Sequence, residues 1–234
     1  MAKKMYQGLL KSVTAVTPTI RELVVTFSEP MPFQAGQFVV LHIPHEGKLA
    51  PRAYSIATSE QEPMQISLLF KLVPGGIASE YVRALKGGET LPFTGPFGKC
   101  LFLVPPTPQV VFVATGAGLS QHLSFLRSKA AAFPQTRFRL LLGVWNEVEV
   151  FYQSELEQLQ KSLKNFSFEY VLDQGPQSWT GKTGFVTRHL DQFNFMTTTT
   201  TFYLCGNPAM IKAVKQLLTE RGFDIKMIKE EAFN

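Results

Sequence analysis

The sequence is poor in the residues that hold metals and clusters. Two cysteines, Cys100 and Cys205, and four histidines occur among its 234 residues. Two thiols are too few for an iron–sulfur cluster with the usual four thiolate ligands, and they do not by themselves imply a disulfide. His42 and His45 lie in a segment typical of a strand and turn, without the partners of a zinc site. We therefore expect no metal site.

The chain also lacks long apolar runs and blocks of one charge. No stretch approaches ~18 uninterrupted apolar residues, and the start MAKKMYQGLLKSV is charged without the apolar segment of an export signal. We therefore expect a soluble, cytoplasmic protein with no transmembrane segment. The net charge of +5 is spread over scattered Lys and Arg residues, which argues against nucleic-acid binding. A positive face could meet an acidic protein partner, although an ordinary solvated basic surface is the favoured interpretation.

The first hundred residues are typical of an antiparallel β domain. Short runs rich in β-branched and aromatic residues, such as RELVVTFSEP, QFVVLHIP and MQISLLFKLV, are separated by turn-forming residues. This spacing predicts an antiparallel barrel or sandwich. One helix is expected in GGIASEYVRALKGGE, where apolar residues have helical spacing between two glycine pairs.

After PPTP, at residues 105–108, strands and helices alternate. The run QVVFVA is apolar throughout, as a strand buried on both faces should be. Successive strands are followed by the helical stretches LSQHLSFLRSKAAAF, FYQSELEQLQKSL, TGFVTRHLDQF and PAMIKAVKQLLTERG. This alternation predicts a doubly wound parallel sheet. The length suits two domains of ordinary size, so we place a β domain at residues 1–104 and an α/β domain at residues 105–234.

Three features of the α/β domain lie at strand ends, where such sheets bind ligands. Gly116 and Gly118 follow a strand and open a helix, so their N–H groups can hold a pyrophosphate or simply form a tight turn. Cys205 begins the turn Cys-Gly-Asn-Pro and either faces the crevice or packs as a buried thiol. Asp173 ends another strand, where it either accepts hydrogen bonds from a ribose 2′-hydroxyl or shapes the turn.

The β domain offers two further candidates. The stretch PRAYSIATS brings Arg52, Tyr54 and Ser55 together with small residues. This pattern suits either a strand with one polar face or a surface laid against a flat, phosphate-bearing cofactor. The segment PGGIAS places glycines before a helix whose first turn carries Ser79, which makes a second candidate phosphate site. Two phosphate-binding turns in one small protein indicate a bound cofactor and a second nucleotide.

Together these motifs resemble those of the ferredoxin–NADP reductase superfamily, which includes NADH–cytochrome reductases, flavin reductases and the reductase domains of oxygenases. The resemblance covers nearly the whole chain. It implies an antiparallel β-barrel domain that binds FAD, followed by an α/β domain that binds NAD(P). It rests on six motifs in order: Arg52-Ala53-Tyr54-Ser55, Gly75-Gly76-Ile77-Ala78-Ser79, Gly95-Pro96-Phe97-Gly98, Thr115-Gly116-Ala117-Gly118-Leu119, Cys205-Gly206-Asn207-Pro208 and Glu231-Ala232-Phe233.

The resemblance also implies roles for individual residues. The expected FAD contacts come from Arg52 at the pyrophosphate, Tyr54 at the ring or ribityl chain, Ser55 near flavin N5, and also Ala53, Gly75, Gly76, Ser79 and Phe233. The expected contacts with NADH or NADPH come from Thr115, Gly116, Gly118, Asp173, Cys205 and Gly206. The expected catalytic residues are Ser55, Cys205 beside the nicotinamide, and Glu231 as a source of protons or of electrostatic tuning.

Three positions depart from the family pattern. Gln121 stands where the nicotinamide loop of the family often ends in Pro. Trp145 stands where an Arg often contacts the nucleotide, and it either stacks on the nucleotide or packs against the protein. Asn234 extends the tail one residue beyond Phe233.

The function implied by the resemblance is that of an FAD-dependent oxidoreductase. It would take hydride from NAD(P)H and pass electrons to a separate acceptor, such as a ferredoxin or other redox protein. Asp173 favours NADH because NADPH-using members commonly carry Ser or Arg there, although Lys182 could meet a 2′-phosphate. The alternatives are a reductase of free flavins or quinones, and a non-catalytic regulatory subunit of the same fold.

Overall fold

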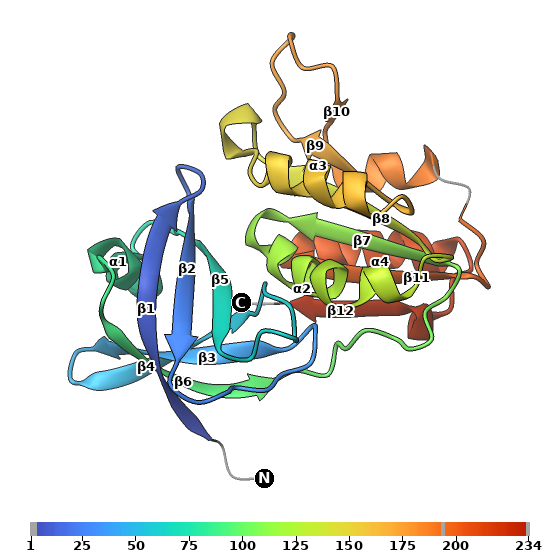
Figure 1. Ribbon diagram of the computed structural model, residues 1–234. Coiled ribbons are helices and arrows are strands. Elements are labelled where there is room, and N and C mark those ends of the chain that lie inside the picture. The colour runs from blue at the N-terminus through green and yellow to red at the C-terminus, as the bar shows by residue number, and fades with distance from the viewer. Residues whose placement is uncertain (1–3, 193–194, 233–234) are drawn as a thin grey trace.

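The computed structural model describes residues 4–192 and 195–232, which form two domains lying side by side (Figure 1). The amino-terminal domain is a β domain with one helix. Its elements are β1 (Met5–Ala15), β2 (Ile20–Phe27), β3 (Phe38–His45), β4 (Lys48–Ser55), β5 (Gln65–Lys71), α1 (Ile77–Ala84) and β6 (Thr90–Phe97).

The strands of this domain form one antiparallel sheet that curls on itself. Their order is β4-β3-β6-β1-β2-β5, and every pairing between neighbours is antiparallel. Ile56, next to β4, forms a bridge with Leu68 of β5, so the two edges of the sheet meet. The inward side chains and the apolar face of α1 share one hydrophobic cluster. The predicted antiparallel barrel is confirmed.

One strand of the barrel, β6, has no counterpart among the predicted strands. It contains Pro92, Gly95 and Pro96, and Pro or Gly inside a run normally argues against a strand. Pairing with β1 on one side and β3 on the other holds β6 in the sheet. Tertiary pairing here outweighs a weak local preference.

The second domain alternates strands and helices. Its strands are β7 (Gln109–Thr115), β8 (Arg137–Val144), β9 (Phe166–Leu172), β10 (Lys182–Thr183), β11 (Thr200–Gly206) and β12 (Ile228–Ala232). Its α-helices are α2 (Leu119–Lys129), α3 (Gln153–Ser162) and α4 (Pro208–Glu220). Short 3₁₀ turns lie at η1 (Gly116–Gly118), η2 (Ala130–Ala132), η3 (Glu147–Glu149), η4 (Val186–Gln192) and η5 (Ile225–Met227).

The sheet of this domain is parallel and covered on both faces. Its order is β10-β9-β8-β7-β11-β12, and every pairing is parallel. Helices α2 and α3 pack on one face, while α4 and η4 pack on the other. The predicted doubly wound sheet is confirmed. The sequence predicts an α-helix in TGFVTRHLDQF, but Val186–Gln192 of this segment form the 3₁₀ helix η4 instead.

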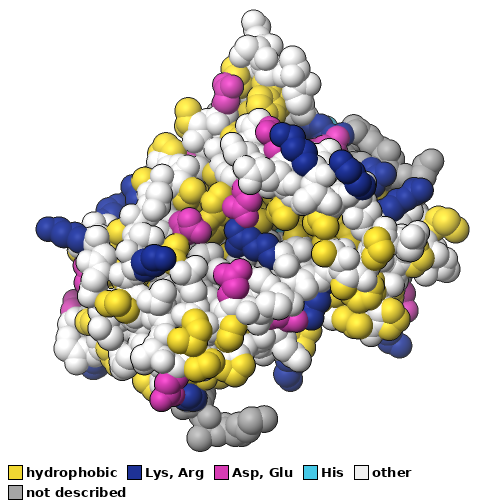
Figure 2. Space-filling model, in the orientation of Figure 1, with side chains coloured by type: hydrophobic (Ala, Val, Ile, Leu, Met, Phe, Trp, Pro, Cys, Tyr) yellow, Lys and Arg dark blue, Asp and Glu magenta, His cyan; other side chains and the backbone are white. Residues whose placement is uncertain are grey.

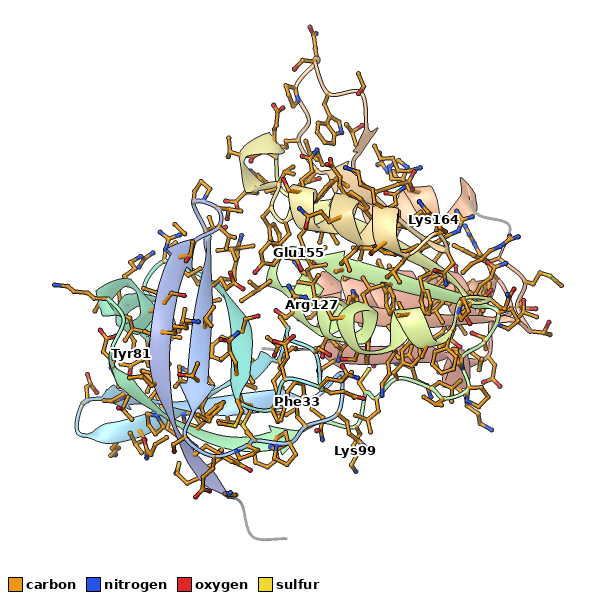
Figure 3. All side chains as sticks on the ribbon, viewed as in Figure 1. Phe33, Tyr81, Lys99, Arg127, Glu155 and Lys164 are labelled. Atoms are coloured by element: carbon orange, nitrogen blue, oxygen red, sulfur yellow. The ribbon has the colours of Figure 1, made fainter. Side chains whose placement is uncertain are left out.

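The two domains share a hydrophobic core. One cluster joins Ile20, Ala57 and Leu69 of the barrel to residues of the α/β domain such as Phe112 and Leu123. Beside it, Arg127 of α2 pairs with Glu155 of α3, and the two side chains face each other in Figure 3. Arg127 Nη1 also donates to the carbonyl oxygen of Ala57 at 2.5 Å. The boundary placed between residues 104 and 105 falls in the segment that connects β6 to β7.

Candidate functional site

A cleft of about 1420 Å³ lies between the two domains and is lined by both of them. It runs along the carboxyl ends of the parallel strands, where an open α/β sheet binds its ligands. Residues predicted for the site that line it are Arg52, Ala53, Tyr54, Ser55, Gly76, Ser79, Thr115, Gly116, Gly118, Asp173, Gly206 and Glu231. Gly75 and Cys205 are not among the lining residues, and Phe233 lies outside the described residues.

The end of β4 forms the barrel side of the cleft. Register with β3 places Arg52, Tyr54 and Ser55 at the edge of the barrel that faces the other domain. The Tyr54 ring packs on Phe70, with ring centroids 3.8 Å apart. Burial raises the pKa of Tyr54 to about 12, against the opposing effect of the Arg52 charge. The phenol therefore stays neutral at ordinary pH and can donate a hydrogen bond.

A glycine turn before α1 forms a second part of the barrel side. Gly75 has a φ of 69°, in the region that glycine adopts most readily. Gly76 caps α1 without a side-chain hydrogen bond, and Ser79 Oγ lies 3.2 Å from where a Cβ on Gly76 would stand. Ser79 Oγ accepts a hydrogen bond from the Val73 N–H at 2.7 Å, which leaves its own hydrogen for another acceptor.

The turn from β7 into α2 forms the α/β side, and it packs directly on the end of β11. A Cβ added to Gly118 would lie 2.3 Å from the carbonyl oxygen of Cys205. Gly206 has a φ of 132°, and a Cβ there would lie 2.4 Å from Thr115 Oγ1. Thr115 Oγ1 accepts from the Asn207 N–H at 2.8 Å. Only glycines allow the two turns to approach this closely.

Cys205 is completely buried below the floor of the cleft. Its side chain has 0% exposure, and the Ser55 side chain of the barrel acts to lower the pKa of its thiol. Burial, together with the nearby Glu231 carboxyl, raises the pKa of the Cys205 thiol well above its usual value. The sequence allowed Cys205 either to face the crevice or to pack as a buried thiol, and the structure has it as a buried thiol. Its predicted place beside the nicotinamide stays a prediction.

Glu231 lies on β12 opposite Cys205 of β11 and lines the cleft. Burial raises the pKa of this carboxyl to about 7, although a hydrogen bond from Gln121 works in the other direction. The group therefore changes its charge near neutral pH, which suits a residue that holds or releases a proton. Gln121 Nε2 donates to Glu231 Oε2 at 2.7 Å.

At the carboxyl ends of β8 and β9, the cleft is lined by the acidic residue Asp173 and by exposed aromatic residues. The Asp173 N–H donates to the Val144 carbonyl oxygen at 2.9 Å, which holds Asp173 at the carboxyl ends of β8 and β9. Trp145 and Phe185 line the same end and are 55% and 61% exposed. Their rings are thus accessible to a planar ligand. Lys182 Nζ lies 3.6 Å from Glu169 Oε1.

Sequence reasoning missed several residues at the site. Gln121 was noted only as a departure from a family pattern, yet it is fully buried and bonded to Glu231. Glu149 also lines the cleft and accepts hydrogen bonds from Thr17 and Thr19 of the barrel, at 2.6 and 2.7 Å. These contacts join residues more than a hundred positions apart, so no local pattern could have revealed them.

Two kinds of feature are absent from the described residues. Within residues 4–192 and 195–232, no helix is long and apolar enough to cross a membrane. In the same ranges, no group of three or more His, Cys, Asp and Glu side chains is placed to hold a metal ion.

Comparison with family models divides the chain as the two domains do. Residues 7–102 match the oxidoreductase FAD-binding domain, and residues 112–216 match the oxidoreductase NAD-binding domain.

Individual relatives and solved structures agree with these matches. The chain is 30% identical to ferredoxin–NADP reductase B of Sorangium cellulosum, over 98% of each chain. It is 34% identical to the anthranilate 1,2-dioxygenase electron transfer component of Acinetobacter baylyi, over 86% of this chain and 58% of that protein. The crystal structure of the cytochrome P450 reductase GcoB of Amycolatopsis superposes with a TM-score of 0.91 at 26% identity, covering 99% of this chain and 70% of the other. The chain thus spans about three fifths of the length of the dioxygenase component, but nearly all of the Sorangium reductase.

Proposed function

This chain belongs to the ferredoxin–NADP reductase superfamily, and we propose that it is an FAD-dependent reductase that oxidises NAD(P)H and supplies electrons to a separate acceptor. One observation carries the proposal. A single cleft receives both glycine turns, one from the FAD-binding domain and one from the NAD-binding domain. A flavin held by the first and a nicotinamide held by the second would therefore meet in the same space.

The barrel side of the cleft fits FAD. The guanidinium of Arg52 suits a pyrophosphate, and the start of α1 at Gly76 and Ser79 adds backbone and hydroxyl donors. Tyr54 offers an apolar ring and a neutral phenol to the flavin or its ribityl chain. Gly75 serves this turn through its backbone shape rather than by lining the cleft.

The α/β side fits a nicotinamide nucleotide. Gly116 has a φ of 51° and open space where a Cβ would stand, so the backbone of η1 is accessible to a phosphate. The N–H groups at the start of α2 and the positive end of its dipole favour a negative ligand. Gly206 and Asn207, at the end of β11, would lie beside the nicotinamide.

Residues between the two halves would prepare the site for the reaction. When bound, FAD accepts hydride from the nicotinamide at flavin N5 and passes the electrons on. Ser55, with Cys205 behind it, would hold a hydroxyl beside that atom. Glu231 would hold a proton at neutral pH at the edge of the same space. Ser55 and Cys205 are 6% and 0% exposed, so solvent would have little access to this part of the floor.

The nicotinamide preference would depend on the charges at the far end of the cleft. Asp173 would favour NADH by accepting hydrogen bonds from the ribose and repelling a 2′-phosphate. Lys182 pairs with Glu169 and is not among the residues found to line the cleft. Arg188 Nη1 lies 3.5 Å from the position of a Cβ on cleft-lining Gly184. Arg188 is therefore a second candidate, in addition to Lys182, for a cation that would oppose Asp173.

The electron acceptor would be a separate molecule. The two cysteines of residues 1–234 are too few for a four-thiolate cluster, so this part of the protein would pass the electrons to another redox centre or to a small molecule. One relative is named for electron transfer to a dioxygenase and another for ferredoxin. A ferredoxin-like redox protein is accordingly the acceptor class that we propose.

Two experiments separate this proposal from its alternatives. After loading with FAD and gel filtration, the protein should remain yellow, because the donors around α1 suit a tightly held dinucleotide. Loss of all flavin on the column would instead favour a reductase of free flavins. In the second experiment, oxidised ferredoxins, quinones and free flavins are added one at a time as electron acceptors, and the rate at which NADH reduces each of them is measured. The proposal requires a redox protein to be reduced with the highest kcat/KM.

A further inference from the structure

Gln121 connects the two domains at the reaction end of the cleft. It belongs to α2 and has 0% exposure. Its amide nitrogen donates to the carbonyl oxygen of Gly36 in the barrel at 3.2 Å and to Glu231 Oε2 at 2.7 Å. Its amide oxygen lies 3.9 Å from the Cys100 thiol, which donates to it. Every hydrogen-bonding atom of this buried amide therefore has a partner.

The partners fix which way the amide points. Gly36 offers only a carbonyl oxygen, so it requires the NH₂ group on its side. A flipped amide would place its oxygen against the Gly36 carbonyl oxygen, which can only accept, and against the Glu231 carboxylate when that group is charged. It would also turn the NH₂ group toward the Cys100 thiol, and the buried Gly36 carbonyl oxygen would lose the donor. Gln121 consequently always presents a donor to Glu231 Oε2.

This polarity limits where a proton can sit on Glu231. Oε2 accepts from Gln121 whether the carboxyl is charged or neutral. The proton of the neutral form must therefore sit on Oε1. That oxygen lies 3.4 Å from the position of a Cβ on Gly98, at the FAD-binding domain.

We propose that Gln121 is a positioning residue that anchors the Glu231 carboxyl between the two domains and directs its proton to Oε1. The inference deepens the proposed function, because it gives the candidate proton-holding residue a fixed orientation toward the flavin side. The hydrogen bonds themselves are independent of whether the protein turns over NAD(P)H.

The pKa of Glu231 can report the role of Gln121, because burial and the Gln121 hydrogen bond shift this pKa in opposite directions. Burial favours the neutral carboxyl, whereas the Gln121 donor favours the carboxylate, and together they bring its pKa to about 7. The other titratable groups around it are the thiols of Cys205 and Cys100, with Lys229 and Glu230 on β12. Burial raises the pKa of both thiols, so they are neutral through the range in which Glu231 titrates.

Carboxyl ¹³C NMR of glutamate-labelled protein provides the direct test. In Gln121→Leu the Glu231 titration should move upward by about one to two pH units, because a charge-assisted hydrogen bond to the carboxylate is lost. Glu231→Gln identifies the resonance. Gln216→Leu is the matched control, since Gln216 Nε2 donates to Glu220 Oε1 at 2.8 Å on the exposed side of α4. That variant should leave the Glu231 titration unchanged.

A second measurement on the unaltered protein covers the case in which Gln121→Leu does not fold. The side-chain ¹⁵NH₂ resonance of Gln121 should shift with pH and show the same midpoint as the Glu231 carboxyl carbon. A Gln121 resonance that ignores this titration, or an unmoved Glu231 midpoint in folded Gln121→Leu, overturns the inference. Neither readout needs NAD(P)H. Failure of the inference is therefore distinct from failure of the proposed function, which would appear as flavin that no nicotinamide reduces.

Discussion

At the scale of single residues, Arg52 is the clearest test of the flavin side. It lines the cleft on β4, where its Nη1 donates to the Pro51 carbonyl oxygen at 2.8 Å. Arg52→Ala should weaken FAD binding by about 10- to 100-fold, the effect of losing a charge-assisted hydrogen bond, and should affect NADH binding less. Equilibrium dialysis with FAD and with NADH measures both.

A matched arginine provides the control for this prediction. Arg83 of α1 belongs to the same domain, but it pairs with exposed Glu80 and is not one of the residues that line the cleft. Arg83→Ala should retain FAD as the unaltered protein does. Full flavin occupancy in Arg52→Ala would contradict the role assigned to Arg52.

Glu231 predicts a pH dependence with a definite sign. Its pKa is raised from 4.5 to about 7, mainly by burial. The neutral, proton-holding form therefore prevails below pH 7, and kcat should fall as the pH rises through this value. Glu231→Gln should lower kcat at pH 6 by about 10²-fold, as expected for loss of a general acid. It should also abolish the fall of kcat near pH 7 in the pH–rate profile.

The neighbouring acid tests whether this effect is specific. Glu230 lies next to Glu231 on β12, where it pairs with Lys215 at 2.8 Å and is not found among the cleft-lining residues. Glu230→Gln should keep both the rate and the pH profile. A limb near pH 7 that persists in Glu231→Gln would assign it to another group.

Asp173 is expected to decide whether the protein prefers NADH or NADPH. Asp173→Ser removes the charge that would repel a 2′-phosphate, so the ratio of kcat/KM for NADH to that for NADPH should fall by about tenfold or more. Arg188→Ala should raise the same ratio, because it removes a candidate cation for that phosphate beside cleft-lining Gly184. Steady-state kinetics with both nucleotides measure the ratio. An unchanged ratio in Asp173→Ser would show that this carboxylate does not select the nucleotide.

At the scale of the elements, the packing of the β7–α2 turn on the end of β11 explains why Gly118 is needed. Gly118→Ala should cost about 1–3 kcal/mol of unfolding free energy, because the new Cβ meets backbone at 2.3 Å. It should also weaken NADH binding, since the turn must move.

Gly222→Ala is the control for this prediction. Gly222 has a φ of 81° and open space where a Cβ would stand, so the variant should cost about 1 kcal/mol of unfolding free energy and leave NADH binding intact. Urea unfolding and NADH titration compare them; equal NADH affinity in both variants would contradict the prediction.

The elements also show how far the sequence could predict this structure. Helices α2, α3 and α4 follow from apolar periodicity, strands β7, β8, β9 and β11 follow from their apolar runs, and the glycine turns follow from their place after strands. Strand β6 could not be predicted because its Pro and Gly residues argue locally against a strand. Strand β12, Ile228–Ala232, carries too little apolar pattern to be recognised, and pairing with β11 defines it.

The candidate site was predictable to a similar degree. Residues in recognisable turns, such as Gly76 and Gly116, lie at the cleft as expected. The sequence leaves open whether Cys205 faces the crevice or packs as a buried thiol, and in β11 its side chain is buried. The Gln121–Glu231 hydrogen bond spans 110 positions in the chain. Such contacts depend on how two domains meet, which no short motif encodes.

At the scale of the whole molecule, the shared core holds the two halves of the cleft in one arrangement. Apolar residues of both domains form one cluster, and Arg127 and Glu149 add hydrogen bonds across the boundary. On the face shown in Figure 2, basic and acidic side chains are interspersed with apolar ones. With a net charge of only +5, recognition of an acceptor there would rest on local contacts more than on a long-range field.

The most direct test of the central claim is anaerobic reduction of the FAD-loaded protein. NADH or NADPH is added in equal amount to the flavin, and the visible absorbance of the flavin is followed without any acceptor. The proposed function predicts that the yellow colour is bleached, faster with NADH, and that it returns when an oxidised redox protein is added. A protein that takes up no FAD, or a yellow protein that neither nucleotide bleaches, would contradict it.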